Sequence, residues 1–353
     1  MTAVLNRSRI TDATLDAIAS AAGAVDRGET ATRSIFPTLG AEGVLDLGAP
    51  DTGNGTLAEM AGVIESIAAR CMSTAFSLWA TRMTIEYLRT AGTPTAIEQA
   101  ERLATGEVLG ITGMASAFKD LAGCGTLELT ADPVDDGFVV SGPIRWASNL
   151  FEDSVMVTAA RTATGGKVIV QLPLDTDGVT VGAPFSLLAL GSTASSSLTL
   201  EDVRIPHEQV LTQDTAEFLT RVRPTFTILQ TAMCLGVAGT SVQQAREGLV
   251  GVTSTYAAEL DGVFGRHTLA RATMRQLADR VGGSATPAKA ELLALRLAAA
   301  EIATDAAGLE LRTAGGKGYA SATPANRRFR EAAFIPVQSP SEGQLRWELA
   351  SCH

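Results

Sequence analysis

Aromatic residues and cysteines are scarce in this chain of 353 residues. Phe, Trp and Tyr together account for 5% of the sequence, and its four cysteines lie far apart from one another. No CxxC pair and no Cys/His spacing typical of zinc proteins occurs, so the sequence predicts no metal site. Isolated cysteines of this kind indicate reduced thiols in a cytoplasmic protein rather than a disulfide framework.

Clusters of Lys and Arg are missing as well. The formal net charge is −10 and the sequence pI is about 4.9. A protein that neutralises nucleic-acid phosphates needs a basic face, so we expect no nucleic-acid partner. The N-terminus lacks the apolar region of a signal peptide, and no run reaches the roughly 18 uncharged apolar residues of a membrane span. We therefore expect no membrane span.

The hydrophobic residues that are present, 46% of the chain, suffice for a sizeable core. Their spacing is helical up to about residue 108, alternating in short runs between turns over 109–212, and helical again over 213–353. Regularly spaced short strands are typical of an antiparallel barrel or sandwich. The sequence thus predicts an α+β fold, mostly α, with its β part in the middle.

Two stretches in the predicted β part could contact a ligand. In "GPIRWASN", Trp146 and Ser148 lie two residues apart and therefore project from the same face of a strand. The indole could lie against a flat ligand ring whose edge bonds the hydroxyl, or it could simply fill the core. In "GITGMASAFKD", a small-residue loop after a short strand, Thr112 could donate a hydrogen bond.

Two stretches near the C-terminus carry glycines or an acid. In "RTAGGKGYASATPANRRFREA", Gly315 and Gly316 belong to a cluster that ends a helix and lets the backbone approach a ligand closely. A Schellman-type helix end explains one such glycine but not the cluster. In "QSPSEGQLRWELA", Glu342 is either a proton-abstracting base or a charge that stabilises the first turn of a helix.

Taken in order, these stretches resemble motifs of the acyl-CoA dehydrogenase family of FAD enzymes. "ITGMASA" is similar to the family's T-E-x-x-A-G-S-D loop, and "GPIRWASN" is similar to its G-x-K-x-W-I-[ST]-N strand. "LGSTASSSLTLEDVRIPHEQVL" and the glycine-rich stretch resemble two further motifs. The resemblance implies an N-terminal helical domain (1–108), a middle β-barrel domain (109–212) and a C-terminal four-helix bundle (213–353).

The resemblance also implies a FAD cofactor between the middle domain and the bundle. Thr112, Trp146 and Ser148 would contact its isoalloxazine ring. Gly315 and Gly316 would lie beside the adenosine half of a FAD that a neighbouring subunit holds. An oligomer is therefore implied, either a homodimer or homotetramer or a heteromer.

Two positions that meet the FAD phosphates in the family are altered. The arginine of its R-x-x-F-G motif is replaced by Leu260 or Asp261, which removes a charge-assisted contact to the pyrophosphate. Arg266, just past that motif, is a candidate substitute. The glutamine of the family's Q-x-x-G-G motif is Arg312, a second possible phosphate partner.

The family's catalytic base is the glutamate of an E-G-T turn, and two alignments place that glutamate differently. Without gaps, the base position falls on Ser339; with three extra residues, Glu342 and Gly343 become the E-G pair. The first alignment preserves more of the matches that follow. The second preserves the chemistry, in which a carboxylate removes the α proton of an acyl thioester. Glu342 is thus the candidate catalytic residue and Ser339 the alternative.

Three functions follow from the resemblance. The first is a FAD-dependent oxidoreductase that desaturates an acyl thioester on CoA or an acyl carrier protein and passes electrons to an unidentified acceptor. The second is a flavin monooxygenase on the same fold, which needs no base. The third is a non-catalytic partner subunit of a heteromeric acyl-CoA dehydrogenase, suggested by the altered phosphate contacts.

Overall fold

The computed structural model describes residues 9–352 of the chain. The α-helices are α1 (Asp12–Asp26), α2 (Phe36–Ala41), α3 (Leu57–Ala68), α4 (Met72–Ala91), α5 (Pro94–Ala104), α6 (Ala115–Leu121), α7 (Thr215–Glu247), α8 (Ala257–Ala278), α9 (Lys289–Ala314), α10 (Gly316–Tyr319), α11 (Pro324–Phe334) and α12 (Glu342–Ala350). The strands are β1 (Gly110–Gly113), β2 (Thr130–Val134), β3 (Gly137–Ala147), β4 (Val155–Arg161), β5 (Lys167–Pro173), β6 (Val179–Val181), β7 (Ser196–Pro206) and β8 (Val210–Thr212).

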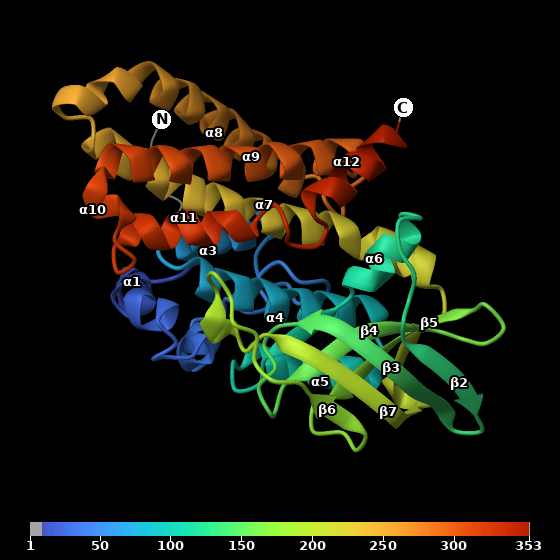
Figure 1. Cartoon of the computed structure of the whole chain (residues 1–353). Coiled ribbons are helices and arrows are strands. Elements are labelled where there is room, and N and C mark those ends of the chain that lie inside the picture. The colour runs from blue at the N-terminus through green and yellow to red at the C-terminus, as the bar shows by residue number, and fades with distance from the viewer. Residues whose placement is uncertain (1–8, 353) are drawn as a thin grey trace.

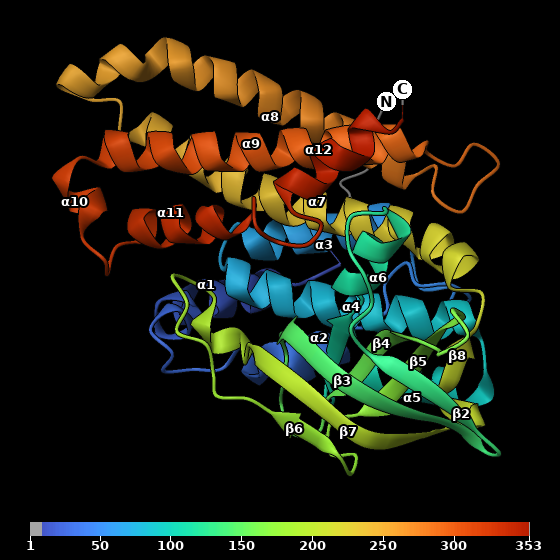
Figure 2. The ribbon, with the colours of Figure 1, turned by 45° about the vertical axis from the view of Figure 1, so that its right-hand side comes forward.

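Helix α4 lies at the centre of the molecule. It contacts β1 and β4 of the sheet on one side and α7 on the other. Figures 1 and 2 show the C-terminal helices stacked above α3 and α4, with the sheet below α4. The order helices, sheet, helices confirms the predicted α+β fold class.

Local sequence signals explain where the helices around α4 begin and end. The side chain of Thr56 caps α3 in a capping box with Glu59. Gly92 ends α4 in the left-handed conformation, which glycine adopts without strain. Thr93 caps α5, and Pro94 occupies its first turn, where no N–H is needed.

The sheet has eight strands in the order β6-β7-β3-β2-β4-β5-β8, and β1 pairs with β4. Most pairs are antiparallel, as predicted, but β1–β4 and β2–β4 are parallel, so the sheet is mixed. The stretch 110–120 is also more ordered than the predicted loop, because it forms β1 and then α6. Phe118 of α6 is buried, which anchors this short helix against the bundle.

Helix α7 is a single helix of 33 residues. Gly236 allows its close approach to α3, because a Cβ there would lie 2.3 Å from the carbonyl oxygen of Glu65. By length and composition alone, α7 is apolar enough to cross a membrane. Threonines and glutamines lie between its apolar residues, so the sequence contains no continuous apolar run here. Its most apolar window is 89% buried against neighbouring helices, which accounts for the composition.

Candidate active site

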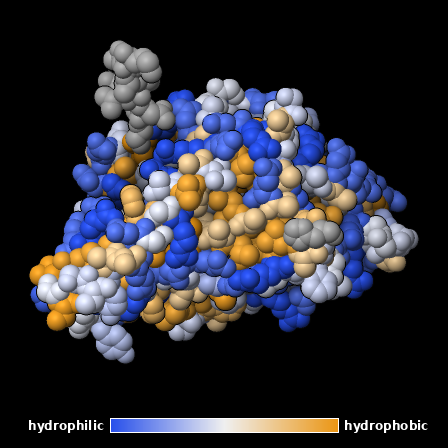
Figure 3. All heavy atoms as spheres, turned by 90° about the horizontal axis from the view of Figure 1, so that it is seen from above, coloured by the Kyte–Doolittle hydropathy of each residue, from blue (hydrophilic) through white to orange (hydrophobic). Residues whose placement is uncertain are grey.

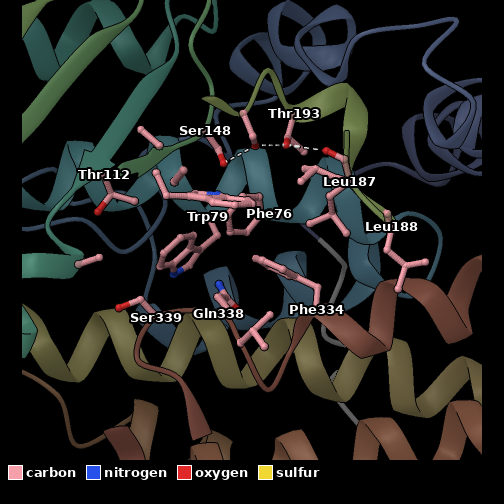
Figure 4. A pocket seen from close by; sticks show the side chains of 18 of the residues that line it. Phe76, Trp79, Thr112, Ser148, Leu187, Leu188, Thr193, Phe334, Gln338 and Ser339 are labelled. Atoms are coloured by element: carbon pink, nitrogen blue, oxygen red, sulfur yellow. Dashed lines mark hydrogen bonds between the residues drawn. The ribbon is translucent and has the colours of Figure 1, made fainter. Parts of the chain in front are cut away.

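A cavity of about 510 Å³ lies between the sheet domain and the helices. The sheet side, called here the barrel wall, is lined by Thr112, Ala115, Lys119, Trp146, Ala147, Ser148, Leu187, Leu188, Ala189, Leu190, Thr193 and Ser195. The opposite side, called here the helical wall, is lined by Phe76, Trp79, Ala80, Phe226, Arg330, Ala333, Phe334, Val337, Gln338 and Ser339. Figure 4 shows Thr112, Ser148 and Thr193 across the cavity from Gln338 and Ser339.

The end of β3 is fixed to α4 and to β1 by one buried amide. The Asn149 side chain donates hydrogen bonds to the carbonyl oxygens of Ser77 and Gly110, at 2.9 and 3.0 Å. Its backbone has a φ of 63°, a left-handed conformation that asparagine tolerates better than most residues. This turn aims the neighbouring Ser148 at the cavity, where its hydroxyl shares a 2.6 Å hydrogen bond with that of Ser195.

Trp146 lies at the mouth of the cavity and not in the core. Trp146 is 50% exposed, and its ring packs on that of Phe185 with 4.4 Å between the ring centroids. An exposed tryptophan costs free energy in water unless something covers it. This placement excludes the core-filling alternative and leaves an indole available to a flat ligand.

Thr112 stands at the inner end of the barrel wall, on β1. Its hydroxyl shares a 3.0 Å hydrogen bond with the phenol of Tyr87. Burial raises the pKa of Tyr87 far above its ordinary value, so the phenol stays protonated at any physiological pH. The neutral phenol fixes the Thr112 side chain and leaves that hydroxyl with further hydrogen-bonding capacity. The structure therefore brings Thr112, Trp146 and Ser148 to one wall of one cavity.

The helical wall is built from aromatic side chains in contact. Phe76 stacks on Trp79 at 5.5 Å between centroids, and Trp79 meets Phe226 edge-on at 5.0 Å. Phe76 also meets Phe334 edge-on at 5.2 Å. These rings come from α4, α7 and α11, so they form a rigid apolar surface. The sequence alone does not single out these rings, because aromatic residues three apart on a helix are indistinguishable from ordinary core positions.

Glu342 does not line the cavity. It is the first residue of α12, and its carboxylate accepts a 2.9 Å hydrogen bond from Arg346. Ser339, by contrast, lines the cavity. Among the lining residues of the described chain there is no Asp or Glu, and the charged ones are Lys119 and Arg330. The placement matches the alternative role for Glu342, a charge on the first turn of a helix.

Gly315 and Gly316 lie at the end of α9 and do not line the cavity. Gly315 has a φ of 63°, and a Cβ at either glycine would meet no atom within 4 Å. Their backbone is thus open to an approaching molecule. Because the resemblance puts the adenosine half of a neighbouring subunit's FAD here, their role stays a prediction.

Both arginines that could meet the pyrophosphate are already ion-paired. Arg312 donates to Glu259 through Nη1 at 3.0 Å and lies over the Tyr256 ring at 4.9 Å. The hydrogen bonds from Arg312 hold the pKa of the Glu259 carboxyl below its ordinary value, so the pair is charged on both sides. Arg266 likewise donates to Asp305 at 2.8 Å. A phosphate would have to displace a carboxylate from either one.

Known proteins are similar to this chain in sequence and in fold. No protein-family model matches the chain. The mitochondrial short-chain specific acyl-CoA dehydrogenase of Bos taurus is 26% identical over 227 residues, which are 60% of this chain and 55% of that protein. The chain thus spans little more than half the length of the curated relatives it matches. Butyryl-CoA dehydrogenase from Megasphaera elsdenii has a TM-score of 0.86 at 18% identity, covering 100% of this chain and 99% of its own.

The chain has the fold of the acyl-CoA dehydrogenases and is similar in sequence to members of that family at modest identity. The sequence-based resemblance is thereby confirmed. PigA, solved with FAD and proline, has the same fold with a TM-score of 0.81 at 16% identity, covering 100% of this chain and 99% of its own.

The barrel wall of this cavity fits a flavin ring. A half-exposed indole offers a flat surface, and hydroxyls at Thr112 and Ser148 suit the nitrogen and oxygen atoms along the ring's edge. Apolar side chains with a few convergent polar groups are typical of cofactor cavities. The fit is weaker for the pyrophosphate, because Arg312 and Arg266 are each already ion-paired with a carboxylate of this chain.

Proposed function

We propose that this chain is a FAD-dependent oxidoreductase that acts on an acyl thioester in the described cavity. The flavin ring would lie on the barrel wall, against Trp146 and within reach of Thr112 and Ser148. The acyl group would lie between that ring and the aromatic helical wall. The observation that carries the proposal is the convergence of these three side chains on one cavity that faces α4 and α7.

The protein's own groups supply orientation and exclude water. FAD, when bound, supplies two-electron redox chemistry, and in its reduced form it can activate molecular oxygen. Trp146 would hold the ring flat, while the hydrogen-bonded pair of Ser148 and Ser195 would fix its edge. The rings of Phe76, Trp79 and Phe226 would keep the reacting acyl carbon dry.

We further propose that the reaction proceeds without a carboxylate base, as a flavin-dependent monooxygenation. Removing the α proton of a thioester needs a base at hydrogen-bonding distance. No carboxylate lines the described cavity, and at the two candidate base positions Ser339 lines it while Glu342 does not. Monooxygenation instead transfers one atom of O2 to the acyl group and reduces the other to water, with two electrons from a reductant such as NADH acting through a flavin reductase. The base role of Glu342 is not part of this proposal.

The ion pairs of Arg312 and Arg266 favour a second candidate function, a partner subunit that contributes half of a FAD site. An exposed apolar face supports an oligomer of either kind. Phe264 and Leu269 of α8 are 44% and 71% exposed, and Val252 just before that helix is 87% exposed. Figure 3 views this side of the molecule and shows apolar patches between the polar side chains. Free cysteines are consistent with the cytoplasmic location that we also propose.

The proposed reaction is tested by mixing the FAD-incubated chain with a panel of short acyl-CoA thioesters. Without oxygen, we expect the visible band of the bound flavin to persist, because no carboxylate lines the described cavity. With oxygen, NADH and a flavin reductase, we expect an oxygenated acyl product by mass spectrometry. Rapid anaerobic bleaching would contradict base-free chemistry. Flavin retention only after co-expression with a homologous subunit would establish the second candidate.

A further inference from the structure

Three polar side chains of the helical wall have no hydrogen-bond partner among the described residues. They are the indole nitrogen of Trp79, the amide nitrogen of Gln338 and the hydroxyl of Ser339. All three residues line the cavity, and Trp79 and Gln338 are only 3% and 4% exposed. A buried polar group left without a partner costs about 1–3 kcal/mol, so each of these three groups would be stabilised by an acceptor on a bound ligand.

The orientation of the Gln338 amide is set by a buried arginine behind it. Its oxygen accepts a hydrogen bond from Nη2 of Arg296 at 3.4 Å, and an arginine can only donate. The Gln338 nitrogen is therefore the end that remains free. Figure 4 shows the Gln338 side chain directed toward Trp79, with Ser339 beside it. The indole nitrogen can likewise only donate. The free groups thus form a set of donors.

Arg296 also gives this wall a positive charge. It is fully buried, and its other partners are neutral, the side-chain oxygen of Gln230 at 3.4 Å and the carbonyl oxygen of Ile335 at 3.2 Å. Within residues 9–352 it forms no salt bridge, and its Nη1 has no partner. A buried cation without a counter-ion is costly, and a nearby anion would reduce that cost.

We infer that the substrate carries a carboxylate on its acyl group and that this carboxylate docks against Trp79, Gln338 and Ser339. A carboxylate only accepts hydrogen bonds, so it matches a wall of donors backed by a cation. Gln230 holds the wall in place, because its amide donates a 2.8 Å hydrogen bond to the carbonyl oxygen of Ser339. The substrate class is a short dicarboxylic acyl thioester. This inference rests on the proposed function, which places the acyl group on this side of the cavity.

A matched pair of ligands tests the inference by equilibrium binding. Succinyl-CoA and butyryl-CoA have the same chain length and differ in a terminal carboxylate against a methyl group. By calorimetry on the FAD-incubated chain, we expect succinyl-CoA to bind at least about tenfold more tightly, as one charge-assisted hydrogen bond requires. Trp79→Phe keeps the ring but removes the donor, and it should reduce this preference about tenfold. Gln338→Leu should act in the same direction.

Trp347→Phe, which removes an indole donor outside the cavity, is the matched control and should keep the preference. The visible flavin band is recorded for every variant, because its loss reports failure of the proposed cofactor site and not of the carboxylate wall. Equal affinity for the two thioesters, binding of neither, or a preference that survives Trp79→Phe would overturn the inference. Equal affinity would assign the donors to the thioester carbonyl that both ligands share.

Discussion

Replacing Ser339 by glutamate is expected to accelerate anaerobic reduction of bound flavin by butyryl-CoA by roughly 10²–10⁴-fold, the usual contribution of a positioned general base. Ser339 lines the cavity opposite the barrel wall, so Ser339→Glu places a carboxylate where the cavity otherwise has none. Butyryl-CoA is the suitable substrate, since the new charge would repel a dicarboxylic one. Stopped-flow absorbance of the flavin measures the rate directly.

Glu342→Gln is the matched control for this gain of function. Glu342 is ion-paired with Arg346 on the surface of α12, outside the cavity. The substitution should therefore leave flavin reduction unchanged in both the native and the Ser339→Glu background. Loss of activity in Glu342→Gln would restore the alignment that makes Glu342 the base. No gain in Ser339→Glu, with flavin still bound, would contradict the placement of Ser339.

Glu348→Ala is expected to lower the free energy of unfolding by about 3–5 kcal/mol, the usual cost of stranding one member of a buried ion pair. Glu348 is 1% exposed and accepts hydrogen bonds from Arg223 at 2.6 Å. A 2.8 Å salt bridge to Lys289 adds to this pair. The carboxylate thus ties α12 to α7 and α9, and it supports the segment that carries Gln338 and Ser339. Urea unfolding of both proteins gives the difference.

The stability that the Glu348 carboxylate contributes depends on pH. Burial raises the pKa of the Glu348 carboxyl, but the hydrogen bonds from Arg223 and Lys289 outweigh it, so the folded-state pKa lies below the ordinary 4.5. The stabilisation is therefore complete above pH 4.5 and disappears as the pH falls through the folded-state pKa. Glu342→Ala, an exposed acid on the same helix, should change stability by no more than about 0.5 kcal/mol. A similar loss in both variants would show that the buried pair has no special role.

The barrel wall could be predicted from the sequence, and the helical wall could not. Trp146 and Ser148 stand at strand spacing next to a turn, so a shared face follows from backbone geometry alone. Trp79 and Phe226 lie within helical stretches whose neighbouring residues are also buried, so nothing local separates a cavity wall from a core. The donors at Trp79 and Gln338 become visible only when the folded chain leaves them without partners.

Glu342 illustrates a different limit. A shift of three residues decides whether the base position holds Glu342 or Ser339, and a helix start favours an acid for its own reasons. Only the fold shows that the Ser339 side of this turn faces the cavity while Glu342 pairs with Arg346. The parallel pairing of β1 with β4 was similarly out of reach, since it joins segments separated by α6 and two further strands.

A titration of the purified chain with FAD tests the central claim most directly, that the barrel wall holds a flavin ring. Visible absorbance and quenching of tryptophan fluorescence should report saturable binding by the native chain. Trp146→Ala should weaken it about tenfold or more, in line with the loss of an aromatic contact, while Trp347→Ala, another exposed tryptophan outside the cavity, should not. Binding that is unaffected by Trp146→Ala, or no binding at all, would contradict the account.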